Sequence, residues 1–135
     1  MVSRILLIED NPADAYLIRE ALRSHGVESE IEWLADGDRA VDRIATFDSG
    51  SQTPDLILLD LNLPRTDGKQ ILAHIRENSR LEATPVAILT SSDSERDRAE
   101  TARLGANCYI RKPPTLDEFM RVGGAIRKLL EAARI

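Results

Sequence analysis

An unbroken apolar run that ends in a carboxylate is the feature that most constrains this chain. Leu56 to Leu59 are consecutive apolar residues, Asp60 follows them directly, and Pro64 comes soon after. A short apolar run bounded by polar and turn residues is typical of a strand buried on both faces, as in parallel sheets. A carboxylate at the end of such a strand lies at the carboxyl edge of the sheet, where open α/β folds bind their ligands. Asp60 is therefore the first candidate for a functional residue.

Strand-like runs and helical patterns alternate along the whole chain. The expected strands cover residues 4–8, 28–34, 56–59, 86–90 and 107–110. A helical pattern follows each of them, so the alternation predicts a single α/β domain over residues 1–135, with a parallel sheet, helices on both faces and right-handed crossovers. The expected fold is the flavodoxin-like doubly wound (βα)5 sheet with strand order 2-1-3-4-5, which places the first and third strands side by side.

Two of the expected helices carry unusual features. The fourth, which ends at Gly105, has a thin apolar face, so we expect it to be held weakly and to be free to shift. The fifth carries an apolar stripe from Leu116 to Ala133, but Gly123 and Gly124 interrupt it. Each glycine costs about 1 kcal/mol relative to alanine within a helix. Close packing against a partner and a local bend are both compatible with this pair.

The bulk properties of the chain narrow its class. A chain of 135 residues with 42% hydrophobic content buries roughly two-thirds of the surface that its unfolded form exposes, and so folds without disulfides or a structural metal. The net charge of −5, with Lys and Arg mixed among acids, argues against a nucleic-acid partner. No apolar run approaches the ~20 residues of a membrane span, and the N-terminus does not resemble a signal peptide. We therefore expect a cytoplasmic protein with no membrane partner, in which the lone Cys108 is a small core residue.

Two neighbouring strands of the predicted sheet end in acids. Glu9 and Asp10 follow the first strand and Asp60 follows the third, so the three carboxylates are expected to converge at one corner. Two carboxylates ~4 Å apart repel by about 4 kcal/mol at an effective dielectric constant near 20. Either their pKa values rise or a cation lies among them. Oxygen ligands with open positions suit Mg²⁺, which keeps several waters and accepts phosphate oxygens. The sequence therefore predicts Mg²⁺ as the cofactor.

A hydroxyl and an ammonium group reach the same edge of the sheet. Thr90 ends the fourth strand, and Lys112-Pro113 follows the fifth. With a carboxylate nucleophile and a divalent metal they describe a phosphoryl-accepting site, in which Asp60 forms an acyl phosphate and Mg²⁺ and Lys112 neutralise the phosphoryl oxygens. A cis bond between Lys112 and Pro113 is expected because it would aim the ammonium inward, although only ~5% of such bonds are cis in folded proteins.

These residues carry a resemblance to a known family. Over essentially its whole length the chain resembles the response-regulator receiver domains of two-component signalling. The matching motifs are Glu9-Asp10, Asp60, Leu63-Pro64-x-x-Asp67-Gly68, Thr90-Ser91 and Lys112-Pro113. The resemblance implies that Asp60 is the phosphoacceptor and that Thr90 and Lys112 hold the phosphoryl oxygens.

The resemblance also implies the metal ligands and a switch. The implied ligands of Mg²⁺ are Asp10, Asp60, the backbone carbonyl of Asn62 and, through water, Glu9. Tyr109 matches the aromatic residue whose ring turns inward when Thr90 moves toward the phosphate. The expected mechanism is a two-state equilibrium that phosphate biases, in which the surface formed by the fourth helix, the fifth strand and the fifth helix changes shape.

The chain is expected to act as a stand-alone response regulator. It ends at Ile135, directly after the last helix, so we expect no output domain. A sensor histidine kinase would supply the phosphoryl group, a protein contact, dimerisation or phosphate relay would carry the output, and the chain would catalyse only its own phosphorylation and dephosphorylation. Details such as Asn11-Pro-Ala-Asp14 are similar to single-domain regulators that partner bacterial phytochrome kinases, which implies a phytochrome partner and a homodimer. His25 and His74 are expected at the surface or at helix ends, without a role in relay.

Three other classes of protein share part of this pattern. A haloacid-dehalogenase-type phosphatase would need a second Asp two positions after the nucleophile, where this chain has Asn62, and room for a cap domain. A flavodoxin would need a Ser/Thr/Gly-rich phosphate loop after the first strand, where Glu9-Asp-Asn-Pro12 would repel phosphate. A degenerate receiver that acts as a scaffold would not need the intact acids.

Overall fold

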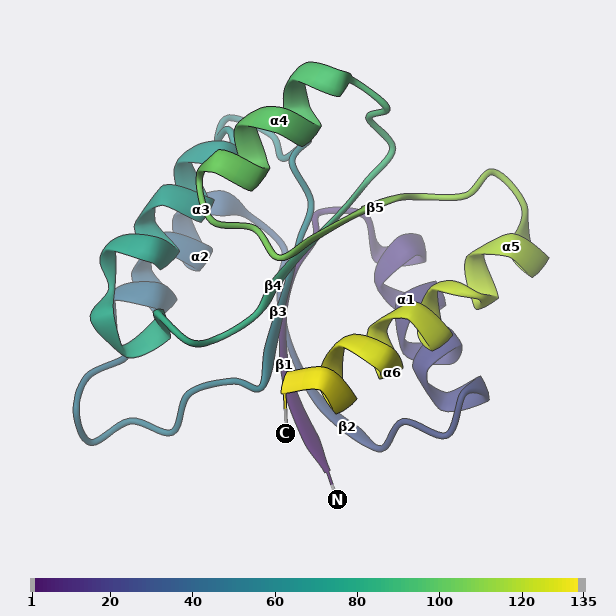
Figure 1. Cartoon of the computed structure of the whole chain (residues 1–135), viewed down its shortest axis with the longest axis horizontal. Coiled ribbons are helices and arrows are strands. Elements are labelled where there is room, and N and C mark those ends of the chain that lie inside the picture. Colours follow the sequence, from purple (N-terminus) through teal and green to yellow (C-terminus); the bar gives the residue numbers. More distant parts are fainter. Residues whose placement is uncertain (1, 134–135) are drawn as a thin grey trace.

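Five parallel strands form one sheet in the order β2-β1-β3-β4-β5, in a computed structural model that describes residues 2–133 (Figure 1). The strands are β1 (Ser3–Ile8), β2 (Ser29–Leu34), β3 (Leu56–Leu59), β4 (Val86–Thr90) and β5 (Cys108–Arg111). The helices are α1 (Pro12–Ser24), α2 (Gly37–Ala45), α3 (Gly68–Glu77), α4 (Glu95–Arg103), α5 (Leu116–Met120) and α6 (Val122–Ala133), with a 3-10 helix η1 (Ser79–Leu81). Within residues 2–133, none of the helices combines the length and the apolar character that crossing a membrane requires. The predicted fold and strand order are confirmed.

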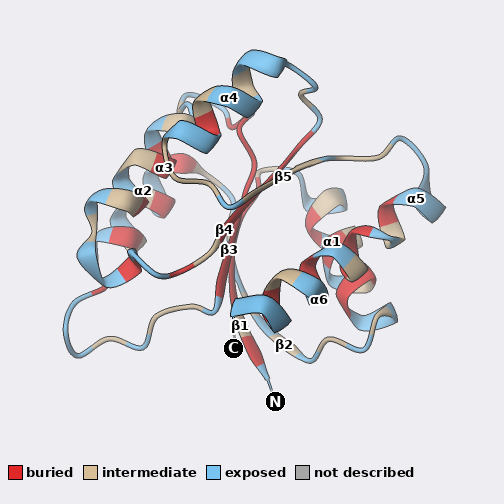
Figure 2. Cartoon of the chain, viewed as in Figure 1, coloured by how far each residue is buried: buried red, intermediate tan, exposed pale blue. Residues whose placement is uncertain are grey.

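The central strands are buried because helices cover both faces of the sheet. Alternate residues of a strand point to opposite faces, so Ile8 and Leu59 pack into the core beneath α2 and α3, while Leu7 and Leu58 pack beneath α1, α5 and α6. Figure 2 shows buried residues along the strands and exposed residues on the outer faces of the helices. Cys108 is half-buried and packs against the second of these cores, which confirms its packing role only in part.

Capping residues mark the start of helices α1 and α3 at the carboxyl edge of the sheet. Asn11 caps α1, because its side-chain oxygen accepts hydrogen bonds from the backbone of Ala13 (2.9 Å) and of Asp14 (3.3 Å). Asp67 caps α3 in the same way, and Gly68 follows it. A Cβ atom on Gly68 would lie 2.7 Å from the carbonyl oxygen of Asp60, so glycine lets the loop after β3 fold back tightly onto the start of α3.

The predicted single last helix is two helices. The break lies at Arg121, where backbone hydrogen bonds span three residues instead of four. The Arg121 N–H donates to the Glu118 carbonyl, and the Gly124 N–H donates to the Arg121 carbonyl. Such i→i+3 bonds tighten the chain at helix termini. The glycine pair that follows has a weak preference for a continuous helix, so the local bend anticipated from the sequence is present just before it.

Gly123 also brings two helix backbones together. A Cβ atom at this position would lie 2.1 Å from the carbonyl oxygen of Ala21 in α1, a distance that no side chain can occupy. At Gly124 the nearest atoms belong to the ring of His25, at 3.1 Å and beyond. The Nε2 atom of His25 lies 2.9 Å from the carbonyl oxygen of Met120, so this histidine, at the end of α1, helps to hold α1 against the α5–α6 junction. The close-packing alternative therefore also holds, with α1 as the packing partner.

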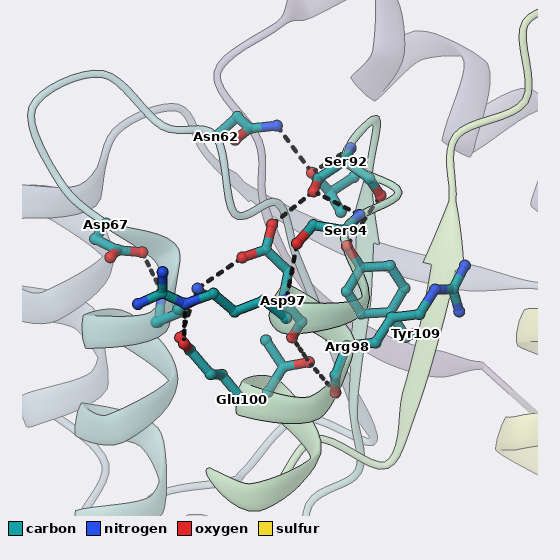
Figure 3. Close-up of polar contacts among 12 residues, drawn as sticks. Asn62, Asp67, Ser92, Ser94, Asp97, Arg98, Glu100 and Tyr109 are labelled. Carbon is teal, nitrogen blue, oxygen red and sulfur yellow. Dashed lines mark hydrogen bonds and ion pairs between the residues drawn. The ribbon is translucent and has the colours of Figure 1, made fainter.

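Helix α4 attaches to the rest of the fold through polar contacts, which are drawn in Figure 3. Its one buried residue is Thr101, and the other described residues of the helix are exposed or half-buried. Lys69, in the first turn of α3, lies 2.6 Å from Asp97 and 2.7 Å from Glu100 of α4. The thin apolar face predicted for this helix is confirmed. Ion pairs to α3 hold α4 in place, whereas buried apolar residues hold the other helices.

Replacing Gly123 with alanine is expected to destabilise the fold by about 1–3 kcal/mol, because the new methyl group meets backbone that cannot move aside. Gly124→Ala is the matched control: its methyl group would lie 3.1 Å from the His25 ring, a side chain that can shift by a few tenths of an ångström, and the substitution gains about 1 kcal/mol of helix propensity. Urea unfolding of both variants measures the difference. Equal midpoints would contradict the close approach of α1 and α6.

Replacing Lys69 with methionine is expected to loosen α4 selectively, because the helix loses both ion pairs to α3. Amide hydrogen exchange should become several-fold faster in α4 and stay unchanged in α1. Arg96→Met is the control, since Arg96 pairs with the same Glu100 from an exposed position on α4 itself. Equal exchange in the two variants would show that the α3–α4 pairs do not hold the helix.

Candidate functional site

The three predicted acids meet at the carboxyl edge of the sheet. Glu9 and Asp10 follow β1, Asp60 follows β3, and these strands are neighbours whose last residues, Ile8 and Leu59, pair directly. One carboxylate oxygen from each acid lies within 4.8 Å of the other two. The strand order therefore brings together side chains that are fifty residues apart in sequence, as predicted.

Burial and hydrogen bonding shift the pKa values of Glu9 and Asp60 in opposite directions. Glu9 is 1% exposed and Asp60 5%. Burial raises the pKa of Glu9 to about 8, against the opposing hydrogen bond from Lys112. Burial pushes the pKa of Asp60 in the same direction, but the hydrogen bonds from Lys112 and from the Asn62 backbone N–H outweigh it and hold this pKa below its usual value. At neutral pH Asp60 is thus an ionised carboxylate, the form that can act as a nucleophile.

Lys112 supplies the positive charge inside the acid cluster. Its ammonium nitrogen lies 2.5 Å from a Glu9 oxygen, 2.8 Å from an Asp60 oxygen and 2.8 Å from an Asp14 oxygen. The predicted cis bond after Lys112 is wrong: the Lys112–Pro113 bond is trans, as is every peptide bond among residues 2–133. The ammonium reaches Asp60 without the cis geometry because β5 already ends at the same sheet edge, where the Lys112 N–H donates to the Thr90 carbonyl.

Asp14 is the functional-site residue that the sequence reading missed. It lies in the first turn of α1, and its carboxylate accepts a hydrogen bond of 2.8 Å from the Lys112 ammonium. Its position four residues after Asp10, one helical turn into a capped helix, was the available signal. In the sequence this acid stands out only within the Asn11-Pro-Ala-Asp14 resemblance, which gives no reason to expect a contact with Lys112.

Thr90 is fully buried, and its hydroxyl joins the acid site to a network of polar contacts. Figure 3 labels the members of this network around it, among them Asn62, Ser92 and Asp97. Its hydroxyl oxygen accepts hydrogen bonds from the Asn62 side-chain amide (3.1 Å) and from the Ser92 backbone N–H (3.4 Å). The Ser92 hydroxyl in turn donates to Asp97 of α4, and its carbonyl oxygen accepts a hydrogen bond of 2.9 Å from the Tyr109 hydroxyl. The site thereby connects with both α4 and β5.

Tyr109 is half-buried in this structure. Its ring packs against the core beneath α3, its hydroxyl bonds to Ser92, and the guanidinium of Arg98 lies 4.5 Å from the ring centre. The switch role of Tyr109 stays a prediction. His74 is exposed on α3, and His25 lies at the end of α1, which are the surface and helix-end positions expected for the two histidines.

The donor set of the acid cluster fits a hard divalent cation. Glu9, Asp10 and Asp60 offer oxygen atoms alone, within reach of one ion. Such sets suit Mg²⁺, which pairs one or two carboxylates with waters and phosphate oxygens. Lys112 is a single positive charge against the three acids of the cluster and Asp14, so the site retains negative charge for a cation to offset. The structure does not test the predicted contribution of the Asn62 carbonyl, which stays a prediction.

Comparison with known proteins places the chain in a family. A model of the response regulator receiver domain matches residues 5–122. Response regulator Rcp1 of Synechocystis is 38% identical over 120 residues, which cover 87% of this chain and 82% of Rcp1.

Solved structures give the same result. The phosphorylated cyanobacterial phytochrome response regulator RcpA superposes with a TM-score of 0.86 at 36% identity, covering 96% of this chain and 94% of RcpA. The Mn²⁺-bound form of Rcp1 has a TM-score of 0.83 at 37% identity, covering 93% of this chain and 92% of Rcp1.

Mg²⁺ binding at the acid cluster is expected to change the emission of Trp33, the one tryptophan of the chain, because its indole N–H donates to the backbone carbonyl of Glu9 at 2.6 Å. Asp10→Asn should weaken the apparent Mg²⁺ affinity at least ten-fold, since a charge lost from a cluster of this spacing is worth several kcal/mol. Titration with NaCl at matched ionic strength is the control. An equal response to NaCl, or an unaltered affinity in the variant, would place the cation elsewhere.

Proposed function

The chain belongs to the response regulator receiver domain family, and we propose that it accepts a phosphoryl group on Asp60 from a sensor histidine kinase. The observation that carries the proposal is the setting of Asp60: an ionised, buried carboxylate with acids for a metal on one side and the Lys112 ammonium on the other. Neither a scaffold nor a flavin-binding domain requires an ionised, buried carboxylate between acids and an ammonium group.

The proposed step is a transfer between two nucleophiles. A carboxylate oxygen of Asp60 attacks phosphorus, the P–N bond to the kinase histidine breaks, and its electron pair stays on the imidazole nitrogen. The product is an acyl phosphate. Transfers of this kind depend on positioning and on electrostatic stabilisation of the phosphoryl oxygens. The chain would catalyse only this reaction and the hydrolysis of the acyl phosphate, which passes the phosphoryl group to water and restores the free Asp60 carboxylate.

Each neighbour of Asp60 has a place in this step. The residues that would hold Mg²⁺ are Glu9, Asp10, Asp60 and the carbonyl of Asn62. When bound, the ion would neutralise charge on the phosphoryl oxygens. Lys112 would turn one of its donors from Asp60 to a phosphoryl oxygen, and the Thr90 hydroxyl would donate to another.

The proposed switch would act on the rest of the protein through the hydrogen bonds that link Thr90 to Ser92, and Ser92 to α4 and β5. A hydroxyl that turns to the phosphoryl group gives up its bonds from Asn62 and Ser92. Ser92 also holds Asp97 and Tyr109, so movement of this loop disturbs the attachments of α4 and of the Tyr109 ring together. The surface formed by α4, β5 and α5 is the part of the protein that we propose a partner reads.

The partner proposals rest on the relatives. RcpA is described as a phytochrome response regulator, and this chain spans 94% of its structure. We therefore propose a phytochrome kinase as the phosphodonor. We also propose stand-alone action of this receiver in the cytoplasm, and a homodimer, on the resemblance of its Asn11-Pro-Ala-Asp14 segment to single-domain regulators. Light-dependent transfer from a phytochrome kinase, and sedimentation of the purified chain, test the first and the last of these.

Incubation with acetyl phosphate and Mg²⁺ is expected to add the mass of one phosphoryl group, and Asp60→Asn is expected to abolish the addition because the nucleophile is lost. Thr90→Ala should retain phosphorylation but lose any change in α4 exchange that accompanies it, because the link to Ser92 is removed. Intact mass spectrometry and hydrogen exchange measure the two effects. Absence of a label on the wild-type protein, with and without Mg²⁺, would sink the proposed function and favour a scaffold.

A further inference from the structure

Lys112 has more partners than its proposed role needs. An ammonium group has three N–H donors, and three carboxylates, those of Glu9, Asp14 and Asp60, surround this one at 2.5–2.8 Å. The Lys112 side chain is 10% exposed, so water supplies little of its solvation. The ammonium donates hydrogen bonds to Asp14 and Asp60 and forms an ion pair with Glu9, so its direction depends on all three side chains.

Asp14 differs from the other two carboxylates in its position. Glu9 and Asp60 belong to the acid cluster that fits a cation, and Asp14 does not. It also comes from α1 rather than from a strand end. A cation that engages Glu9 and Asp60 therefore competes with Lys112 for those two partners and leaves Asp14 untouched.

The local structure fixes Asp14 firmly enough to hold another side chain. Asn11 caps α1 and accepts a hydrogen bond from the backbone N–H of Asp14 itself. The next residue, Ala15, is buried in the core beneath α1. The Asp14 side chain is 23% exposed, at the mouth of a cavity of about 470 Å³ that Lys112 also lines. A carboxylate on such a rigid first turn retains its geometry whether or not the acid cluster is occupied.

We propose that Asp14 is a positioning residue that keeps the Lys112 ammonium beside Asp60 while a cation engages the other two carboxylates. This role rests on the proposed phosphoryl transfer to Asp60. Without Asp14 the long lysine side chain loses the partner that the cation does not take, and it spends less time where a phosphoryl oxygen arrives.

The alternative to this role is ordinary helix chemistry. An acid in the first turn of a helix is favoured by the partial positive charge of the helix N-terminus, whatever it contacts. Asp38 offers a matched control, because it lies in the first turn of α2 and takes no part in the site. Asp14→Asn and Asp38→Asn each remove one such charge without changing side-chain shape.

A double-mutant cycle distinguishes the positioning role of Asp14 from the effect of an acid at a helix N-terminus. Asp14→Asn is expected to lower the rate of phosphorylation at saturating acetyl phosphate about ten-fold, since a hydrogen bond between charged groups is lost. The half-saturating acetyl phosphate concentration should change little, because Asp14 does not meet the donor. In a Lys112→Met background the same substitution should have no further effect. Asp38→Asn should leave the rate unchanged in both backgrounds.

A second measurement needs neither metal nor activity. In EDTA, urea unfolding of the same variants should show that Asp14→Asn lowers the midpoint in the wild-type background and not in the Lys112→Met background. Lys112→Gln, which also removes the charge, replaces Lys112→Met if the latter loses a cooperative transition.

The outcomes are distinct. Equal effects of Asp14→Asn in the two backgrounds, or equal effects of Asp14→Asn and Asp38→Asn, overturn the positioning role while phosphorylation of the wild type stands. Failure of the wild type to take up a phosphoryl group overturns the proposed function, and the role of Asp14 in it.

Discussion

The contact between the Lys112 ammonium and the acids is the interaction on which the functional edge of this protein depends. Strand order forces Glu9 and Asp60 together, and burial at 1% and 5% exposure deprives them of water. Uncompensated carboxylates at such distances repel by several kcal/mol, a large share of the ~5–15 kcal/mol that holds a domain folded. Lys112 offsets that repulsion from a third strand end, so β1, β3 and β5 meet at one charged centre.

The same contact divides the protons unequally between the two buried acids. Glu9 is raised to a pKa of about 8 by burial, while the bonds to Asp60 hold its pKa low. Glu9 can therefore carry a proton at neutral pH, while Asp60 stays ionised. This asymmetry gives Asp60 the character of a nucleophile before any cation or phosphodonor arrives.

The sequence predicts the sheet and its acids well because both follow from short-range patterns. Apolar runs identify strands, alternation with helices identifies the topology, and topology alone brings Asp60 to Glu9. The failures concern details that depend on tertiary distance. The prediction of a cis Lys112–Pro113 bond goes against the usual preference for trans, and it fails because the reach of a lysine side chain depends on where β5 ends.

Asp14 and the glycine pair show the same limit. A helical turn places Asp14 on one side of α1, but its contact spans 98 residues of sequence. The break at Arg121 and the approach of Gly123 to Ala21 likewise require knowing which helix lies alongside. Position in the chain identifies these residues as unusual, and only the packed structure says what they do.

Helices α1 and α6 on one face of the sheet and helix α4 on the other are attached by different interactions, and this difference bears on how such a protein can change over generations. On one face, α1 and α6 touch backbone to backbone, so substitutions at that junction disturb the fold itself. On the other, α4 contributes one buried residue and rests on ion pairs that many polar side chains could replace. The surface of α4 is therefore free to drift toward new partners under mutation while the core and the acid site are inherited unaltered.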